Sequence, residues 1–247
     1  MKEKILKALK EIEKKNNVKI VMVIESGSRA WGFASKDSDY DVRCMHVGKI
    51  KDYLGLNTPA KQINFVEEDL DIESWDVKKF AELTLSSNPQ IAEWLRSPII
   101  YVDLGLKKKF KEIFDTGCSY EFLRLHYLRM AKQNYHKYMG IGLNHSCKKY
   151  LYVLRGIACA KYIEKENKLP PLPYKEVIPF LPKFAEVFFE KCVVKKNSTE
   201  KAEILADSKV VAFIEESIGK VGSVDQTFSE KDALNSLLVS SIEKFGV

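Results

Sequence analysis

The chain has 247 residues, of which 45% are hydrophobic and 30% charged, and its formal net charge at pH 7 is +6. These values are ordinary for a globular protein, and the length allows one large domain or two small ones. The sequence contains no apolar run long enough for a signal peptide or a membrane span, so we expect a soluble, cytoplasmic protein.

The cysteines exclude two further classes of protein. They are odd in number, widely spaced, and lack the paired Cys or His spacing of a zinc site (Cys44, Cys118, Cys147, Cys159 and Cys192). We therefore expect reduced thiols rather than a disulfide framework or a zinc module.

The beginning of the chain predicts a helix, a strand and a tight turn. Residues 2–16 carry apolar side chains at helical spacing, which is typical of an amphipathic helix packed on a sheet. The apolar, β-branched run from Val18 to Ile24 predicts a buried strand. It ends at Ser26-Gly27-Ser28, where glycine permits a tight turn. A short helix beginning near Arg29 would turn the backbone N–H groups of this segment into a site for phosphate oxygens.

A pair of carboxylates follows this turn. On a strand running from Asp39 to Val47, Asp39 and Asp41 point to one face, while Tyr40 and Val42 point to the other. Two carboxylates held together repel each other unless a cation lies between them. A phosphate-binding turn followed by such a strand therefore predicts a site for a magnesium nucleotide. The alternative is an ordinary turn followed by an exposed acidic pair.

A second acidic strand is predicted over residues 65–75. Its polar face carries Asp71 and Glu73, and either could supply a third carboxylate to the metal, with Asp71 the first choice. The alternative is that both belong to the solvated face of an edge strand. Helical patterns over 76–87 and 90–95 and a strand over 99–102 complete this part, so we expect the mixed α/β domain to span residues 1–103.

The remainder, residues 104–247, is predicted to form a helical domain. Helical patterns cover residues near 105–114, 119–139, 147–167, 174–194, 200–219 and 229–245. Between Tyr120 and Lys165 nine basic residues face only two acidic ones, which suits a polyanionic partner such as a triphosphate or RNA. The alternative for this region is a solvated helix face without a ligand.

The two motifs together resemble a known family. Glu25-Ser26-Gly27-Ser28-Arg29-Ala30-Trp31-Gly32-Phe33 followed by Ser38-Asp39-Tyr40-Asp41-Val42-Arg43 is similar to the signature of the YcgL-like or RlaP nucleotidyltransferases of the DNA polymerase β superfamily. The resemblance extends over about residues 18–175 and includes Lys148-Lys149-Tyr150-Leu151-Tyr152-Val153-Leu154-Arg155. It implies an α+β fold: a polymerase-β-like nucleotidyltransferase domain, with a small mixed sheet flanked by helices, followed by an all-helical domain.

The resemblance also implies a site. Gly27 and Ser28 would bind the triphosphate, and Asp39, Asp41 and Asp71 would be the catalytic, metal-binding carboxylates of a two-magnesium mechanism. We expect Arg29 to add charge at the phosphates. Arg43 would either contact phosphate or lock the carboxylates. From the helical domain we expect three residues of one helix face to bind the nucleotide (Lys149, Tyr152 and Arg155).

The expected activity is transfer of a nucleoside monophosphate from an NTP, with ATP or CTP as the expected donor, to an acceptor hydroxyl, with release of pyrophosphate. The expected cofactor is Mg²⁺, or Mn²⁺ in its place, and the expected acceptor is an RNA end, in tRNA or RNA repair. One alternative is nucleotidylation of a protein or small molecule. Another is a non-catalytic nucleotide-binding module, against which the three carboxylates and Ser28 argue. No membrane partner is expected, and neither the acceptor nor the oligomeric state follows from the sequence.

Overall fold

The computed structural model describes residues 1–56, 58–138, 144–219, 221–225 and 227–246. The chain divides into two compact units. The sheet unit comprises residues 1–30, 39–118 and 227–247, and the helical unit comprises residues 31–38 and 119–226. Within the described ranges, no helix combines the length and the apolar character that crossing a membrane requires.

The sheet unit contains a five-stranded mixed sheet in the order β3-β4-β2-β1-β5. Its strands are β1 (Lys19–Glu25), β2 (Tyr40–Val47), β3 (Gln62–Glu67), β4 (Leu70–Asp76) and β5 (Ile100–Asp103). Strand β1 pairs antiparallel with β2 and β5, and β3 pairs antiparallel with β4, whereas β2 and β4 run parallel. The small mixed sheet expected from the sequence is therefore confirmed.

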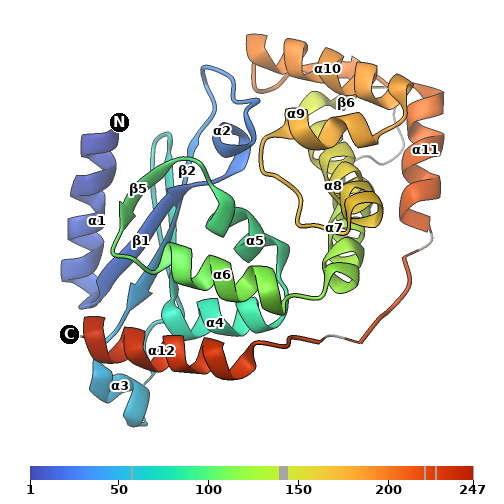
Figure 1. Cartoon of the computed structure of the whole chain (residues 1–247). Coiled ribbons are helices and arrows are strands. Elements are labelled where there is room, and N and C mark those ends of the chain that lie inside the picture. Colours follow the sequence, from blue (N-terminus) through green and yellow to red (C-terminus); the bar gives the residue numbers. More distant parts are fainter. Residues whose placement is uncertain (57, 139–143, 220, 226, 247) are drawn as a thin grey trace. The chain divides into compact units, whose positions relative to one another are not determined.

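Helices cover both faces of this sheet: α1 (Lys2–Asn16) lies on one side, and α4 (Val77–Leu85), α5 (Pro89–Arg96), α6 (Lys107–Gly117) and α12 (Lys231–Phe245) lie on the other (Figure 1). The short helices α2 (Gly27–Trp31) and α3 (Ile50–Leu54) follow β1 and β2. The apolar face of α1 packs on one side of the sheet, where Val42, Leu70 and Ile72 belong to the same buried cluster. Because side chains alternate along a strand, Asp41, Arg43 and their neighbours on β4 point to the opposite side.

The C-terminal helix belongs to the sheet unit, although we predicted it as part of the helical domain. Helix α12 packs against α4 and α6, and α6 in turn packs against α5. The ring of Phe228 fills the space beside Gly117, where a Cβ would lie 2.6 Å from it. The predicted domain boundary at residue 103 therefore differs from the units of the structure. Composition along the chain does not show which distant segments pack together.

A second difference concerns the acidic segment predicted as one strand. The structure has a hairpin instead, in which β3 ends at Glu67, Glu68 adopts a left-handed conformation (φ 52°) and β4 begins at Leu70. The turn has no glycine, proline or asparagine to mark it in the sequence. The alternation of Asp71 and Glu73 with buried Leu70 and Ile72 is nevertheless as expected.

The helical unit is built around α8 (Cys147–Glu166), whose side chains are buried on most sides. Around it lie α7 (Tyr120–Tyr138), α9 (Tyr174–Val177), η1 (Ile178–Phe180), α10 (Lys183–Ser198), α11 (Ser208–Gly219) and the two-stranded pair β6 (Asn144–Ser146) and β7 (Glu203–Leu205). The Ser119 hydroxyl accepts the Phe122 N–H, as expected for a residue that caps α7. Residue 139, where that helix is predicted to end, lies outside the described residues.

Candidate active site

The Gly27–Ser28 turn joins β1 to the short helix α2 and lies directly beside Asp41. Gly27 has a positive φ of 59°, and a Cβ at this position would collide with the Asp41 carboxylate. The turn is held to β2 by the Ser26 N–H, which donates to the Asp41 carbonyl at 2.8 Å. Ser28 is only 5% exposed. Glycine is thus required here both for the backbone conformation and for the close approach.

The start of β2 presents the predicted carboxylate pair. Asp39 is exposed and precedes the strand, while Asp41 is half-buried within it. Arg29 ties the turn to this segment, since its Nε donates to the Asp39 carbonyl at 3.2 Å and its guanidinium lies 3.7 Å from the centre of the Tyr40 ring. Arg29 therefore positions Asp39 as well as adding charge beside it.

The third predicted carboxylate lies across from the second. Strands β2 and β4 run parallel in a register that pairs Asp41 with Asp71 and Arg43 with Glu73. The side chain of Asp71 is 41% exposed, whereas that of Glu73 is 23% exposed and accepts a hydrogen bond from the Trp75 indole at 2.9 Å. Of the two alternatives left open by the sequence, Asp71 is thus the more accessible.

Arg43 joins these carboxylates. Its Nη2 donates to Asp41 Oδ1 at 3.0 Å and to Asp71 Oδ2 at 2.9 Å, and its Nε lies 3.8 Å from Glu73 Oε2. Its Nη1 also donates to the carbonyl of Asp71 at 3.0 Å. The sequence left two roles open for Arg43, contact with phosphate or locking of the carboxylates. The observed contacts correspond to locking of the carboxylates.

The donor set fits a magnesium ion only in part. Asp39 and Asp41 offer the carboxylate oxygens that Mg²⁺ prefers. However, the guanidinium of Arg43 bridges Asp41 and Asp71, and no group of three Asp, Glu, His or Cys side chains among the described residues is arranged to hold a metal. The role of Asp71 as a metal ligand stays a prediction, since Arg43 holds one of its two carboxylate oxygens.

Glu25 is a residue of this site that the sequence analysis missed. It is fully buried at the end of β1, where its carboxylate accepts the Asp41 N–H at 2.9 Å and the Tyr101 hydroxyl at 2.5 Å. Burial raises the pKa of Glu25, although these two hydrogen bonds oppose the shift. An acidic residue closing an apolar strand was the available signal, since such a group is costly to bury without partners.

The three residues predicted on α8 belong to the helical unit. Lys149 and Tyr152 are half-buried, and the Tyr152 ring meets the edge of Trp31 with 5.1 Å between ring centres. Arg155 is only 4% exposed, lies 4.4 Å above the Trp31 ring and donates to the Leu172 carbonyl. Its charge is therefore used inside this unit. The nucleotide-binding roles of Arg155, Lys149 and Tyr152 stay predictions.

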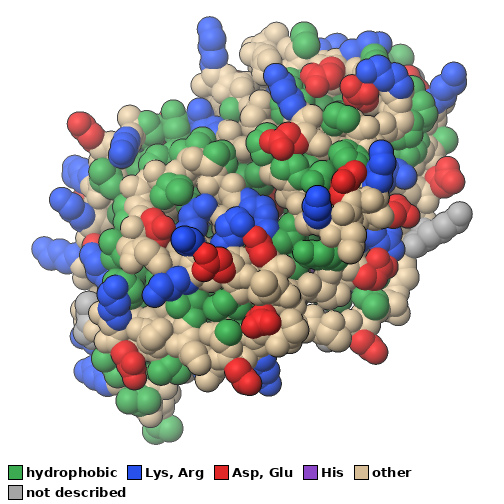
Figure 2. Space-filling model, in the orientation of Figure 1, with side chains coloured by type: hydrophobic (Ala, Val, Ile, Leu, Met, Phe, Trp, Pro, Cys, Tyr) green, Lys and Arg blue, Asp and Glu red, His purple; other side chains and the backbone are tan. Residues whose placement is uncertain are grey.

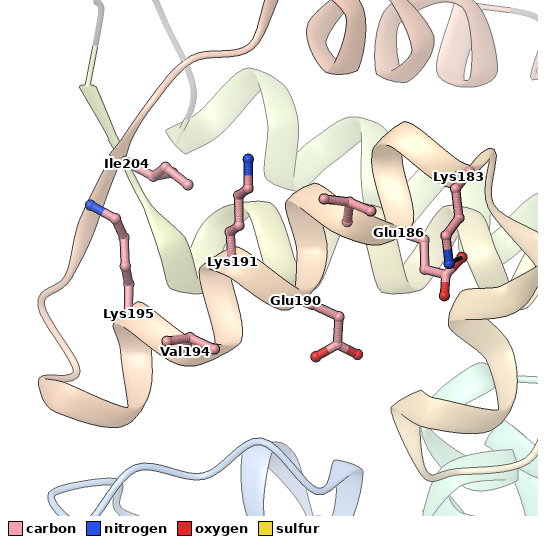
Figure 3. Close-up of a pocket in the computed structure, with 8 residues that line it drawn as sticks. Lys183, Glu186, Glu190, Lys191, Val194, Lys195 and Ile204 are labelled. Atoms are coloured by element: carbon pink, nitrogen blue, oxygen red, sulfur yellow. Dashed lines mark hydrogen bonds and ion pairs between the residues drawn. The ribbon is translucent and has the colours of Figure 1, made fainter.

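A pocket of about 530 Å³ lies elsewhere, on α10 and β7 of the helical unit (Figure 3). Lysines and glutamates line it, including Lys191 and Glu190, together with apolar residues that include Val194 and Ile204. The surface in Figure 2 likewise mixes basic and acidic side chains rather than presenting one sign of charge. Neither feature identifies a second site.

The mixed sheet, the Gly27–Ser28 turn and the acidic start of β2 define a polymerase-β-like nucleotidyltransferase fold. Residues 1–240 match the model of the family described as RlaP, the RNA repair pathway DNA polymerase beta family. The chain belongs to this family.

Two relatives illustrate how far the similarity extends. The uncharacterized protein YcgL of Bacillus subtilis (strain 168) is 35% identical over 258 residues, which covers 99% of this chain and 97% of that protein. The crystal structure of a nucleotidyltransferase-like protein from Exiguobacterium sibiricum 255-15 matches 90% of this chain and 70% of its own, with a TM-score of 0.31 and 9% identity. The second likeness is too distant to inform the site.

Proposed function

We propose that this protein transfers a nucleoside monophosphate from an NTP to an acceptor hydroxyl. The observation that carries the proposal is the contact between the Gly27 turn and the Asp41 carboxylate. The chain belongs to a family described as the RNA repair pathway DNA polymerase beta family, which supports the same proposal. In the reaction, the acceptor oxygen forms a bond to the α-phosphorus, the bond to the β-phosphate oxygen breaks, and pyrophosphate and the acceptor proton leave.

Each residue of the turn has a proposed role. The backbone of Gly27 and the hydroxyl of Ser28 hold the β- and γ-phosphates, and Arg29 adds positive charge beside them. Asp39 and Asp41 would hold magnesium, or manganese in its place, and the bound cation would neutralise charge on the triphosphate and the leaving pyrophosphate. Glu25 orients Asp41 through the Asp41 N–H. Arg43 keeps the carboxylates together while no nucleotide is bound.

The acceptor we propose is an RNA end, with ATP or CTP as the donor. The family description, which places these proteins in RNA repair, supports this choice. We also infer a reducing, cytoplasmic setting, because all five cysteines are free thiols. The second candidate is nucleotidylation of a protein or small molecule, since the carboxylate site itself does not specify the acceptor.

The proposal is tested by incubating the protein with Mg²⁺ and each of the four NTPs, labelled either at the α-phosphate or at the γ-phosphate. Acceptors are tRNA, RNA oligonucleotides and the protein alone. Transfer of α-label but not γ-label to RNA is the expected result. Transfer of α-label to protein alone would favour the second candidate. Binding of NTP without transfer to any acceptor would contradict the proposed activity.

A further inference from the structure

Residues Trp31–Ser38 connect the Gly27–Ser28 turn to Asp39, yet they belong to the helical unit. We call them the connecting segment. Trp31 packs edge-on against Tyr152, and Phe33, only 1% exposed, packs edge-on against the rings of Tyr174 and Phe189, with centres 5.8 and 6.0 Å away. The two ends of this segment are thus covalently joined to the phosphate-binding turn and to the predicted catalytic aspartate.

The last part of the connecting segment is held by an ion pair whose lysine is buried. Ser35 and Ser38 form a turn in which the Ser35 N–H donates to the Ser38 hydroxyl at 2.9 Å. Both hydroxyls donate to Glu200 Oε2, at 2.8 and 2.9 Å. Lys196 Nζ lies 2.6 Å from the same carboxylate oxygen and donates to the Ser38 hydroxyl at 3.0 Å.

The two members of this ion pair differ in burial, since the side chain of Glu200 is 22% exposed. Lys196 is 0% exposed, so its charge is costly unless it is paired and hydrogen-bonded. Burial opposes ionisation of Glu200, but hydrogen bonds from Lys148, Lys196 and Ser35 outweigh it and lower the pKa of Glu200 to about 2. The two charges pair with each other, and both also form hydrogen bonds with the Ser38 hydroxyl, so the ion pair fixes the end of the Ser35–Ser38 turn.

We propose that Lys196 and Glu200 are positioning residues for Asp39. Asp39 follows Ser38 directly in the chain, and its own side chain is exposed. Its position therefore depends on the backbone on either side, which is fixed by Ser38 before it and by the pairing of Tyr40 after it. An error of about 1 Å in a reacting group lowers a rate by about 100-fold. The inference rests on the proposed nucleotidyl transfer, in which Asp39 is a metal ligand.

The test compares two variants with matched neighbours. Lys196→Met and Glu200→Gln remove the pair, whereas Lys195→Met and Glu203→Gln change exposed residues next to them that do not contact the connecting segment in any described interaction. Hydrogen exchange of residues 33–40 and kcat per folded molecule are measured for each. We expect faster exchange, a kcat lowered about 100-fold and an unchanged KM for the NTP in both pair variants, because the Gly27–Ser28 turn still holds the phosphates. The neighbour variants should behave like the unaltered protein.

Three results would overturn the positioning role. The first is unchanged hydrogen exchange of residues 33–40 in the pair variants, and the second is faster exchange with an unchanged kcat. The third is an equal change in exchange and kcat in the neighbour variants. Because Glu200→Gln leaves the buried ammonium of Lys196 without its charged partner, that variant can fail to fold. Lys196→Met, in which Glu200 is partly exposed and keeps its ion pair with Lys148 at 2.7 Å, then decides the matter. The absence of transfer in the unaltered protein, with hydrogen exchange of residues 33–40 still faster in Lys196→Met, would instead refute the proposed function.

Discussion

Gly27 and Asp41 are in direct contact: the Cα of the glycine lies where any side chain would collide with the carboxylate. The two residues come from different elements, the turn after β1 and the second residue of β2. The contact brings the backbone proposed to bind phosphate against the carboxylate proposed to bind metal, so that one nucleotide tail would meet both.

Replacing Gly27 by alanine should therefore abolish activity. We expect Gly27→Ala to lower the rate of transfer at least about 100-fold, because the collision displaces Asp41 from the turn. Gly105→Ala is the matched control, since Gly105 also has a positive φ but has nothing within 4 Å of an added Cβ. It should cost about 1–2 kcal/mol of stability from backbone strain alone and keep its activity. Equal activity in the two variants, measured with labelled NTP, would contradict the role of this contact.

Removing Arg43 should expose the carboxylates to metal. Arg43→Met leaves Asp41 and Asp71 facing each other without a cation, which we expect to cost about 1–3 kcal/mol, since the pair is partly exposed. Mg²⁺ should then raise the melting temperature of this variant more than that of the unaltered protein, because the ion replaces the guanidinium.

The control for that experiment is Arg96→Met, which removes a different arginine–carboxylate pair, with Asp115, from the same unit. It should lower stability but leave the response to Mg²⁺ unchanged. If Mg²⁺ affects both variants alike in thermal unfolding, Asp41 and Asp71 do not form a cation site, and Asp71 is a partner of Arg43 only.

The Glu200 network predicts a particular dependence of stability on pH. The folded-state pKa of Glu200, about 2, is below its ordinary value of 4.5, so its contribution is fully present above about pH 4.5 and is lost as the pH falls towards 2. Glu200→Gln should therefore be less stable than the unaltered protein at pH 7, and the difference should narrow at pH 3. Urea unfolding at both values measures this, and a constant difference would show that the Glu200 charge contributes nothing.

The C-terminal helix should stabilise the sheet unit. Leu234 on α12 is 4% exposed, and its replacement by alanine should cost about 2–4 kcal/mol through lost burial and the resulting cavity. Val239→Ala, at a site 46% exposed on the same helix, should change stability by less than about 0.5 kcal/mol. Denaturant unfolding followed through the tryptophans distinguishes the two. Equal effects would mean that α12 does not pack as described.

Local features of the site were predictable from the sequence. The apolar run before Glu25 and the spacing of Asp39 and Asp41 defined β1, the turn and β2, because each depends on residues close together in the chain. The strand alternation also placed Asp71 and Glu73 on the polar face of β4, but it did not distinguish between them. These inferences rest on the spacing of apolar residues and on turn-forming residues, both of which can be recognised in a single sequence.

Features that depend on distant residues were not predictable. The bridge from Arg43 to Asp71 requires the parallel register of β2 with β4. Arg155 is buried against Trp31 because the connecting segment packs in the helical unit. Helix α12 belongs to the sheet unit because it packs against α4. Helical spacing alone could not separate a buried cation from an exposed one on α8.

The most direct test is the rate at which α-labelled NTP transfers its label to RNA in the Asp41→Asn variant, relative to Asp69→Asn. Asp69 is an exposed residue of the same unit, which contacts only Lys4 among described charged groups, so it controls for a lost carboxylate. We expect Asp41→Asn to lose transfer by about 1,000-fold or more while it remains folded, and Asp69→Asn to retain it. Undiminished transfer in folded Asp41→Asn would contradict a carboxylate-dependent nucleotidyltransferase.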